Sequence, residues 1–281
     1  MATEPLRALA VAPAPAAGAV RLDLDHPLNR AIRRLGATRV AEHLPPGLRA
    51  GAFDDHGWLR REDLLGAATL DLLTAAVASQ AGCDDPRLTG TLLLEGYAWQ
   101  LAAPALGLLL AAGRLPDIDP ATLYVRLADD GRVEALAYAS GRFATLEDDP
   151  EAGHPDATTF ADDHALLAWF RRALVRHLEP VVEAVAPRAR RGRRALWRSV
   201  EDCCSGAMTW IGDELGDGDG ARARAGLLLG VEEPLGDPPC FEVIGEDPGA
   251  PVVRRRIGCC QSFRAPGGAL CPTCPRARVR G

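Results

Sequence analysis

The sequence predicts a mainly helical α+β fold with a small antiparallel sheet and a C-terminal segment built around four cysteines. Two observations predict the fold class: apolar residues recur at helical spacing over most of the chain, and alternating strand patterns are few and short. A third observation predicts a metal-binding segment at the C-terminus, since four of the eight cysteines lie within residues 259–281.

Helical spacing of apolar residues is repeated along the chain. Leu65, Leu72, Leu73 and Val77, for example, fall on one helix face. We expect Pro104 to kink or split the helix that contains it, because proline lacks the backbone N–H. Helices are expected at residues 27–44, 62–81, 90–113, 162–185, 195–215 and 221–229.

The strand signals are clearest near the middle of the chain. Residues 122–127 alternate, a turn follows at Asp129, Asp130 and Gly131, and residues 133–139 resume an extended pattern. This arrangement predicts a β-hairpin. Shorter strands are expected at residues 241–244 and 252–257, the second leading directly into the cysteines.

The composition of the chain predicts three parts. Residues 1–20 are rich in Ala and Pro without the apolar core of a signal peptide, and they are interpreted as a flexible leader. Residues 21–250 are expected to form the main helical domain, and residues 251–281 the cysteine segment. The acidic, turn-rich stretch 147–155 is interpreted as a linker.

The charge balance bears on partners and location. Acidic residues outnumber basic ones by 38 to 32, which argues against a protein that coats nucleic acid. The most apolar stretch, residues 92–112, is interrupted by Glu95, Gln100 and Pro104, so a buried helix is expected rather than a membrane span. We expect a cytoplasmic protein with at most peripheral membrane contact.

The four C-terminal cysteines have the pattern Cys-Cys-x10-Cys-x2-Cys, formed by Cys259, Cys260, Cys271 and Cys274. A Cys-x2-Cys turn aims two sulfurs at one point, so the last two can share one metal. Gly258 makes the bend needed at the vicinal pair easier, and Pro-Gly-Gly at residues 266–268 is expected to reverse the chain and bring the second pair back to the first. Four thiolates can complete the coordination of a [2Fe–2S] cluster.

Other uses of these cysteines stay open on spacing alone. A structural zinc site also takes four cysteines, but usually as two Cys-x2–4-Cys pairs, so the spacing favours a cluster over zinc. A disulfide between Cys259 and Cys260 would be strained and would leave the other two cysteines unexplained.

The cysteine pattern, with Pro-Gly-Gly before its second half, resembles the cluster signature of the FhuF-type ferric-siderophore reductases. The Gly-Tyr-Ala-Trp sequence at residues 96–99 and Ala-Leu-Trp-Arg-Ser-Val at residues 195–200 are also similar to that family. The resemblance implies that Cys259, Cys260, Cys271 and Cys274 bind a [2Fe–2S] cluster.

The resemblance further implies a reductase that passes one electron to ferric iron in a siderophore, with no catalytic residues beyond the cluster. The sequence has no Walker A loop and no convincing dinucleotide fingerprint, so a ferredoxin or an NAD(P)H-dependent reductase must supply electrons. Two alternatives are a siderophore- or ligand-binding protein with a structural zinc site, and an iron–sulfur carrier or regulator.

The remaining candidate residues are assigned mostly structural roles. Cys203, Cys204 and the tryptophans are expected to pack in helices, Cys83 and Cys240 to be buried or incidental, and no histidine to be catalytic. The basic run 188–194 is interpreted as a solvated loop, with docking of an anionic partner as the second possibility. Seven further arginines are each expected to be solvated, and an electrostatic role at the cluster stays open for them as a group: Arg254, Arg255, Arg256, Arg264, Arg276, Arg278 and Arg280.

Overall fold

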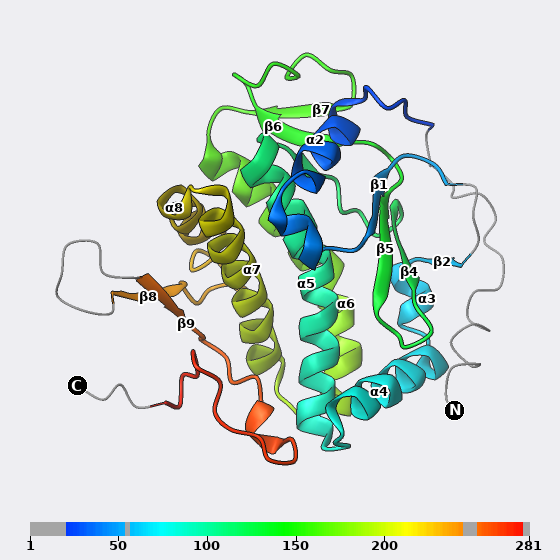
Figure 1. Ribbon diagram of the computed structural model, residues 1–281, viewed down its shortest axis with the longest axis vertical. Helices are drawn as coiled ribbons and strands as arrows, with labels where there is room; N and C mark the ends of the chain where they lie inside the picture. The colour runs from blue at the N-terminus through cyan, green and yellow to red at the C-terminus, as the bar shows by residue number, and fades with distance from the viewer. Residues whose placement is uncertain (1–20, 54–56, 244–251, 278–281) are drawn as a thin grey trace.

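The computed structural model describes residues 21–53, 57–243 and 252–277. Three long helices stand side by side in the middle of the molecule, the larger sheet lies on one flank and the cysteine segment lies on the other (Figure 1). The helices are α2 (Pro27–Gly36), η1 (Arg39–His43), α3 (Arg61–Leu64), α4 (Ala67–Ala81), α5 (Pro86–Ala112), α6 (Asp163–Ala189), α7 (Arg193–Leu215), α8 (Gly218–Leu228) and η2 (Ser262–Arg264).

Helix α5 is the central element and packs against α2, α4, α6 and α7. It begins where Asp85 caps the amides of Arg87 and Leu88, and it ends at Gly113 in the left-handed conformation. Pro104 does not split it, because close packing on all sides holds this part of the helix in the core. Among the described residues, α5 is the one helix long and apolar enough to cross a membrane, yet it is largely buried in the fold.

Helices α6 and α7 differ from the sequence prediction at their junction. Helix α6 continues through Pro187 to Ala189, and α7 already begins at Arg193. The predicted break over residues 188–194 therefore shrinks to three residues. Arg190 adopts φ 48° at the end of α6, and this left-handed residue turns the chain into α7.

Two regions near the N-terminus, each predicted as one helix, are divided in the structure. Thr38 is extended between α2 and η1, and Gly66 separates α3 from α4. The periodicity of apolar residues continues across both interruptions, so the sequence pattern did not reveal them.

The strands form two mixed sheets and one hairpin. The predicted hairpin is confirmed as the antiparallel pair of β4 and β5, but β1 pairs with β5, and β7 with β6, in parallel. The α+β fold class is thus confirmed with more sheet than predicted. The strands are β1 (Gly47–Ala50), β2 (Trp58–Leu59), β3 (Leu115–Pro116), β4 (Leu123–Leu127), β5 (Val133–Tyr138), β6 (Phe143–Leu146), β7 (Ala157–Phe160), β8 (Cys240–Val243) and β9 (Val252–Arg255).

The segment 147–155 is not a linker between domains, because it joins two paired strands of one sheet, β6 and β7. The predicted domain boundary at residues 250 and 251 and the predicted leader at residues 1–20 lie outside the described residues. Strands β8 and β9 pair across that boundary, and β9 leads the chain back to α7.

Candidate iron–sulfur site

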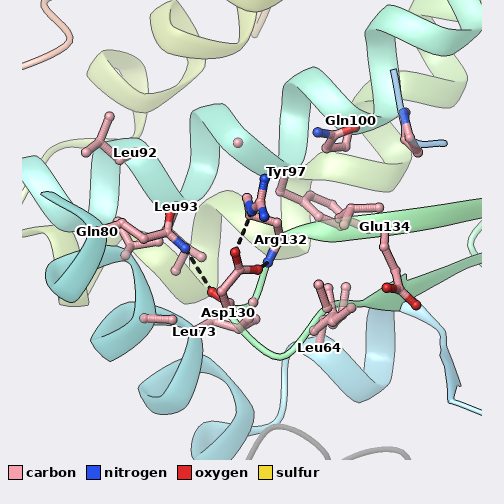
Figure 2. A pocket seen from close by; sticks show the side chains of 18 of the residues that line it. Leu64, Leu73, Gln80, Leu92, Leu93, Tyr97, Gln100, Asp130, Arg132 and Glu134 are labelled. Carbon is pink, nitrogen blue, oxygen red and sulfur yellow. Dashed lines mark hydrogen bonds and ion pairs between the residues drawn. The ribbon is translucent and has the colours of Figure 1, made fainter. Parts of the chain in front are cut away.

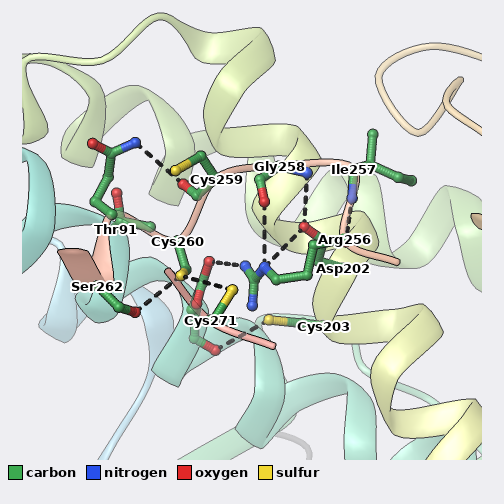
Figure 3. A network of polar contacts seen from close by, with 12 residues as sticks. Thr91, Asp202, Cys203, Arg256, Ile257, Gly258, Cys259, Cys260, Ser262 and Cys271 are labelled. Atoms are coloured by element: carbon green, nitrogen blue, oxygen red, sulfur yellow. Dashed lines mark hydrogen bonds and ion pairs between the residues drawn. The ribbon is translucent and has the colours of Figure 1, made fainter. Parts of the chain in front are cut away.

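The cysteine segment is attached to the helical core through Asp202 of α7 (Figure 3). Its two carboxylate oxygens accept hydrogen bonds from the amides of Ile257 and Gly258, each at 2.8 Å. Arg254 lies 3.0 Å and Arg256 3.3 Å from the same carboxylate, whose side chain is 0% exposed. Asp202 therefore fixes the backbone directly before Cys259.

Arg256 connects this attachment to the central helix. Its guanidinium forms an ion pair with Glu95 of α5, and its backbone amide donates to the carbonyl of Thr273 at 2.9 Å. Burial raises the pKa of Glu95, and Arg256 opposes that shift. Arg256 thereby joins both halves of the cysteine segment to α5.

The chain between the two cysteine pairs reverses direction through a compact turn. Gln261 adopts φ 64°, Gly267 adopts φ 68°, and the amide of Gly268 donates to Ala265 at 2.8 Å. A Cβ on Gly268 would meet the Ser262 carbonyl at 2.3 Å, so only glycine fits there. The reversal predicted from Pro-Gly-Gly is confirmed.

This turn brings the sulfurs of Cys260 and Cys271 to 3.7 Å from each other. Two thiolates on one tetrahedral metal, with bonds of about 2.3 Å, lie about 3.7 Å apart. The Cys-x2-Cys spacing predicted that Cys271 and Cys274 share one metal, whereas the close sulfur contact joins Cys271 to Cys260. Burial together with Cys260 and Cys274 raises the pKa of Cys271 to about 11.

The donor set around the sulfurs fits a two-iron cluster. Cys260 and Cys274 are buried while Cys259 and Cys271 are half-buried, and the amide of Arg276 points at the sulfur of Cys274 from 3.4 Å. A single tetrahedral ion would need all four sulfurs about 3.7 Å apart. Each iron of a [2Fe–2S] cluster takes two of the four thiolates, and the sulfurs of Cys260 and Cys271 already lie at the spacing of two ligands on one iron.

Arg191 is a residue of this site that the sequence analysis missed. It follows the left-handed Arg190, and its guanidinium donates to the hydroxyl of Thr91 at 2.6 Å. Burial lowers the pKa of Arg191, and the thiolates of Cys259 and Cys260 oppose that shift. The only sequence signal was its place in a basic run, which does not distinguish an inward-facing arginine from a solvated one.

The other arginines near the cysteines are mostly paired. Their partners are Asp202 for Arg254, Glu242 for Arg255 and Asp85 for Arg264. Arg276 lies over the ring of Phe263, 4.7 Å from its centroid. Arg278 and Arg280 lie outside the described residues. The expectation that single arginines here are merely solvated is therefore wrong for Arg254, Arg255, Arg256 and Arg264.

The basic run 188–194 is also tied to the protein. Arg188 pairs with Asp71, Arg193 with Glu183, and Arg194 with Glu233 and Asp237. These contacts connect the junction of α6 and α7 to α4 and to the segment after α8. The run is thus mostly helical rather than a loop, but Arg190, Arg193 and Arg194 are exposed, so its predicted solvation is confirmed for these three residues.

The cysteines outside the motif differ in their surroundings. Cys203 and Cys204 are buried in α7, which confirms their packing role. Cys83, after α4, lies 3.5 Å from the carbonyl of Arg264 and so touches the cysteine segment. Cys240 is exposed on β8.

Two histidines and one aspartate also lie together. His26 is 3.2 Å from Asp156, and His154 is 3.8 Å from it. His26 also accepts the amide of Leu28 at the start of α2, and His154 accepts the amide of Asp156. These contacts give the trio a structural role, attaching α2 to the turn before β7.

The fold and the site define an iron–sulfur protein in which a helical core supports a C-terminal four-cysteine segment. Residues 91–232 match the family model described as ferric iron reductase FhuF-like transporter, and residues 256–276 match the FhuF 2Fe-2S C-terminal domain. The chain belongs to the FhuF-like family, and its C-terminal domain is of the [2Fe–2S] type. The resemblance and the cofactor predicted from the sequence are confirmed.

Comparison with other proteins adds little to this assignment. No curated protein matches the chain. One similar solved structure is the ATP-bound aerobactin synthetase IucA from a hypervirulent pathotype of Klebsiella pneumoniae, at 16% identity and a TM-score of 0.46. The match covers 77% of this chain but only 45% of the synthetase, so it carries no argument about function.

Proposed function

We propose that this protein is a reductase that transfers one electron to ferric iron held in a siderophore and so releases ferrous iron. We further propose Cys259, Cys260, Cys271 and Cys274 as the ligands of its [2Fe–2S] cluster. The observation that carries the proposal is the 3.7 Å contact between the sulfurs of Cys260 and Cys271, inside the stretch that matches the family's cluster domain.

The coordination chemistry of iron explains why one electron is enough to release it from a siderophore. Hard oxygen donors hold ferric iron strongly, and their hold weakens once the metal is ferrous. The [2Fe–2S] cluster supplies the single electron. Asp202 and Arg256 position the cysteine backbone, while Arg191 places a positive charge near Cys259 and Cys260 and favours the added negative charge.

The proposed setting follows from the same features. The electron donor is a ferredoxin or an NAD(P)H-dependent reductase, and the site of action is the cytoplasm, with at most peripheral membrane contact. Nucleic acid is not expected as a partner. The competing function is a siderophore- or ligand-binding protein that uses the four cysteines for structural zinc, and an iron–sulfur carrier or regulator is a further alternative.

The test starts with anaerobic purification and assays of iron, acid-labile sulfide and zinc, followed by EPR spectroscopy before and after dithionite. We expect about two irons and two sulfides per chain, a signal that appears on reduction, and ferrous iron trapped by a chromogenic chelator when ferric siderophore is added. Zinc without sulfide would support the binding protein. A reducible cluster without ferrous release would support the carrier or regulator.

A further inference from the structure

A cavity of about 780 Å³ lies between α4, α5 and the hairpin of β4 and β5 (Figure 2). Leu73 of α4 and Leu93 and Tyr97 of α5 give it apolar walls, and Gln80 closes one side by donating to the carbonyl of Asp130 at 2.8 Å. Its volume is in the range of small-molecule sites, which are mostly apolar with a few fixed polar groups.

The cavity and the cysteine segment share helix α5. Thr91 and Glu95 contact Arg191 and Arg256 of the cysteine site, whereas Leu93, Tyr97 and Gln100 line the cavity. At 100° per residue these two sets lie on opposite faces of the helix. A helix with its side chains is about 10–12 Å across, so the face of α5 that lines the cavity and the face that contacts the cysteine site are separated by no more than this thickness.

Gly96 leaves the cavity wall open. A Cβ at this position would meet no heavy atom within 4 Å among the described residues. Two other glycines of α5 have packing reasons, because a Cβ on Gly90 would lie 2.4 Å from Ala189 and one on Gly107 would lie 3.0 Å from Leu35. A glycine inside a helix is destabilising relative to alanine. Packing against the protein therefore does not explain why residue 96 is a glycine, whereas the need for space for a ligand does.

Gln100, one turn further along α5, supplies a polar group at the same cavity. Its Oε1 is buried and has no hydrogen-bond partner within the described part of the chain. Tyr97 does not play this role, because its hydroxyl donates to His177 at 2.7 Å. A buried acceptor without a partner is costly, so a donor from a bound molecule would stabilise it.

We propose that this cavity binds the organic part of the ferric chelate, an inference that rests on the proposed reductase function. Gly96 gives the ligand room, and Gln100, whose buried Oε1 has no partner within the described residues, turns its amide toward the ligand to accept a hydrogen bond from an N–H or O–H group. Asp130 is paired with Arg132 and Glu134 with Arg126, each at 2.6 Å. The paired charges at the rim suit a chelate of low net charge with apolar linkers.

Binding can be tested separately from reduction with the gallium(III) complex of a linear trishydroxamate, because gallium is not reduced. Isothermal titration calorimetry would compare the wild type with Gly96→Leu, Gln100→Leu and Gly226→Leu. Gly226 is the matched control, since it is also an exposed helical glycine with free space at its Cβ. We expect Gly96→Leu to weaken binding at least tenfold and Gln100→Leu several-fold, with Gly226→Leu unchanged.

The outcomes separate the site from the proposed function. Unchanged gallium binding by Gly96→Leu, or no binding by the wild type, would overturn the cavity assignment even if the wild type reduces ferric chelates. Normal gallium binding without reduction would instead contradict the proposed reductase. Iron and sulfide contents and thermal unfolding would establish that Gly96→Leu is folded; if it is not, Gln100→Leu decides, and unchanged binding by that variant would overturn the proposal.

Discussion

The carboxylate of Asp202 lies 2.8 Å from the backbone nitrogen of Gly258, the residue directly before the first motif cysteine. A Cβ on Gly258 would lie 3.2 Å from that carboxylate and 3.1 Å from the Arg198 side chain, so the backbone is pressed against α7. Within its described residues, the cysteine segment after Arg255 has no regular structure beyond the short η2. Its geometry therefore depends on such attachments to the helices.

We expect Asp202→Ala to disrupt this attachment. The substitution would leave the Ile257 and Gly258 amides without their acceptor and would remove the buried carboxylate that pairs with Arg254 and Arg256, although Arg256 keeps its ion pair with Glu95. Breaking a buried ion pair on one side costs about 3–5 kcal/mol. Urea unfolding should show a loss of this size, and iron and sulfide assays should show poor cluster retention.

The matched control for this prediction is Asp71→Ala, which removes an exposed carboxylate paired with Arg188. Exposed ion pairs contribute about 0–1 kcal/mol, so this variant should keep both stability and cluster. Full iron and sulfide in Asp202→Ala would show that the segment holds its geometry without this contact.

The ligand assignment predicts two groups of cysteine variants. Serine at position 259, 260, 271 or 274 should lower iron and sulfide content strongly, because one thiolate of the cluster is lost. Cys83→Ser and Cys240→Ser should retain the cluster, although Cys83 touches the segment through Arg264. Equal loading in all six variants, measured by iron and sulfide assays, would rule out the assignment.

We expect Arg191→Gln to make the reduction potential of the cluster more negative. Reduction adds a negative charge near Cys259 and Cys260, and the substitution removes a nearby positive charge. A tenfold change in the ratio of reduced to oxidised protein corresponds to about 59 mV for one electron, and a shift of about this size is expected. A redox titration followed by absorption would measure it.

Two variants control for nonspecific effects at Arg191. Arg191→Lys keeps the charge and should restore most of the potential, whereas Arg188→Gln removes a charge of the same run that faces Asp71. If Arg188→Gln shifts the potential as much as Arg191→Gln, the effect comes from overall charge and not from the position of Arg191.

Glu201 is expected to make stability depend on pH. Its side chain is buried, and burial raises the pKa of Glu201 from 4.5 to about 7, with the Asp237 amide opposing the shift. The folded state therefore binds more protons than the unfolded state between about pH 4.5 and 7. This contribution is fully present below pH 4.5 and is lost as the pH rises through 7.

Glu201→Gln should remove this contribution to the pH dependence, because glutamine stays neutral. The free energy of unfolding of Glu201→Gln minus that of the wild type should increase by up to about 3 kcal/mol between pH 5 and pH 8. Urea unfolding at several pH values would measure the difference, and other titrating groups such as His177 cancel in the comparison. Parallel curves for the two proteins would contradict the raised pKa. As a control, Glu179→Gln changes an exposed glutamate and should give the same dependence of unfolding free energy on pH as the wild type.

Local patterns in the sequence determined much of this protein. The long helices, the hairpin of β4 and β5 and the reversal between the cysteine pairs were predicted correctly, because each depends on residues close together in the chain. Strands β1, β6 and β7 of the parallel pairs were missed, because four residues are too few to show alternation. The family resemblance followed mainly from the spacing of the four cysteines, together with Pro-Gly-Gly and the similar segments at residues 96–99 and 195–200.

The surroundings of those cysteines were decided only in the tertiary structure. Arg191 meets Thr91 across 100 positions, and Arg256 meets Glu95 across 161. No local pattern marks such partners, since an arginine in a basic run has the same sequence signature whether it faces solvent or a thiolate. The packing of α5 against α6 and α7 brings these residues together, and it places the cavity and the cysteine site on opposite faces of one helix.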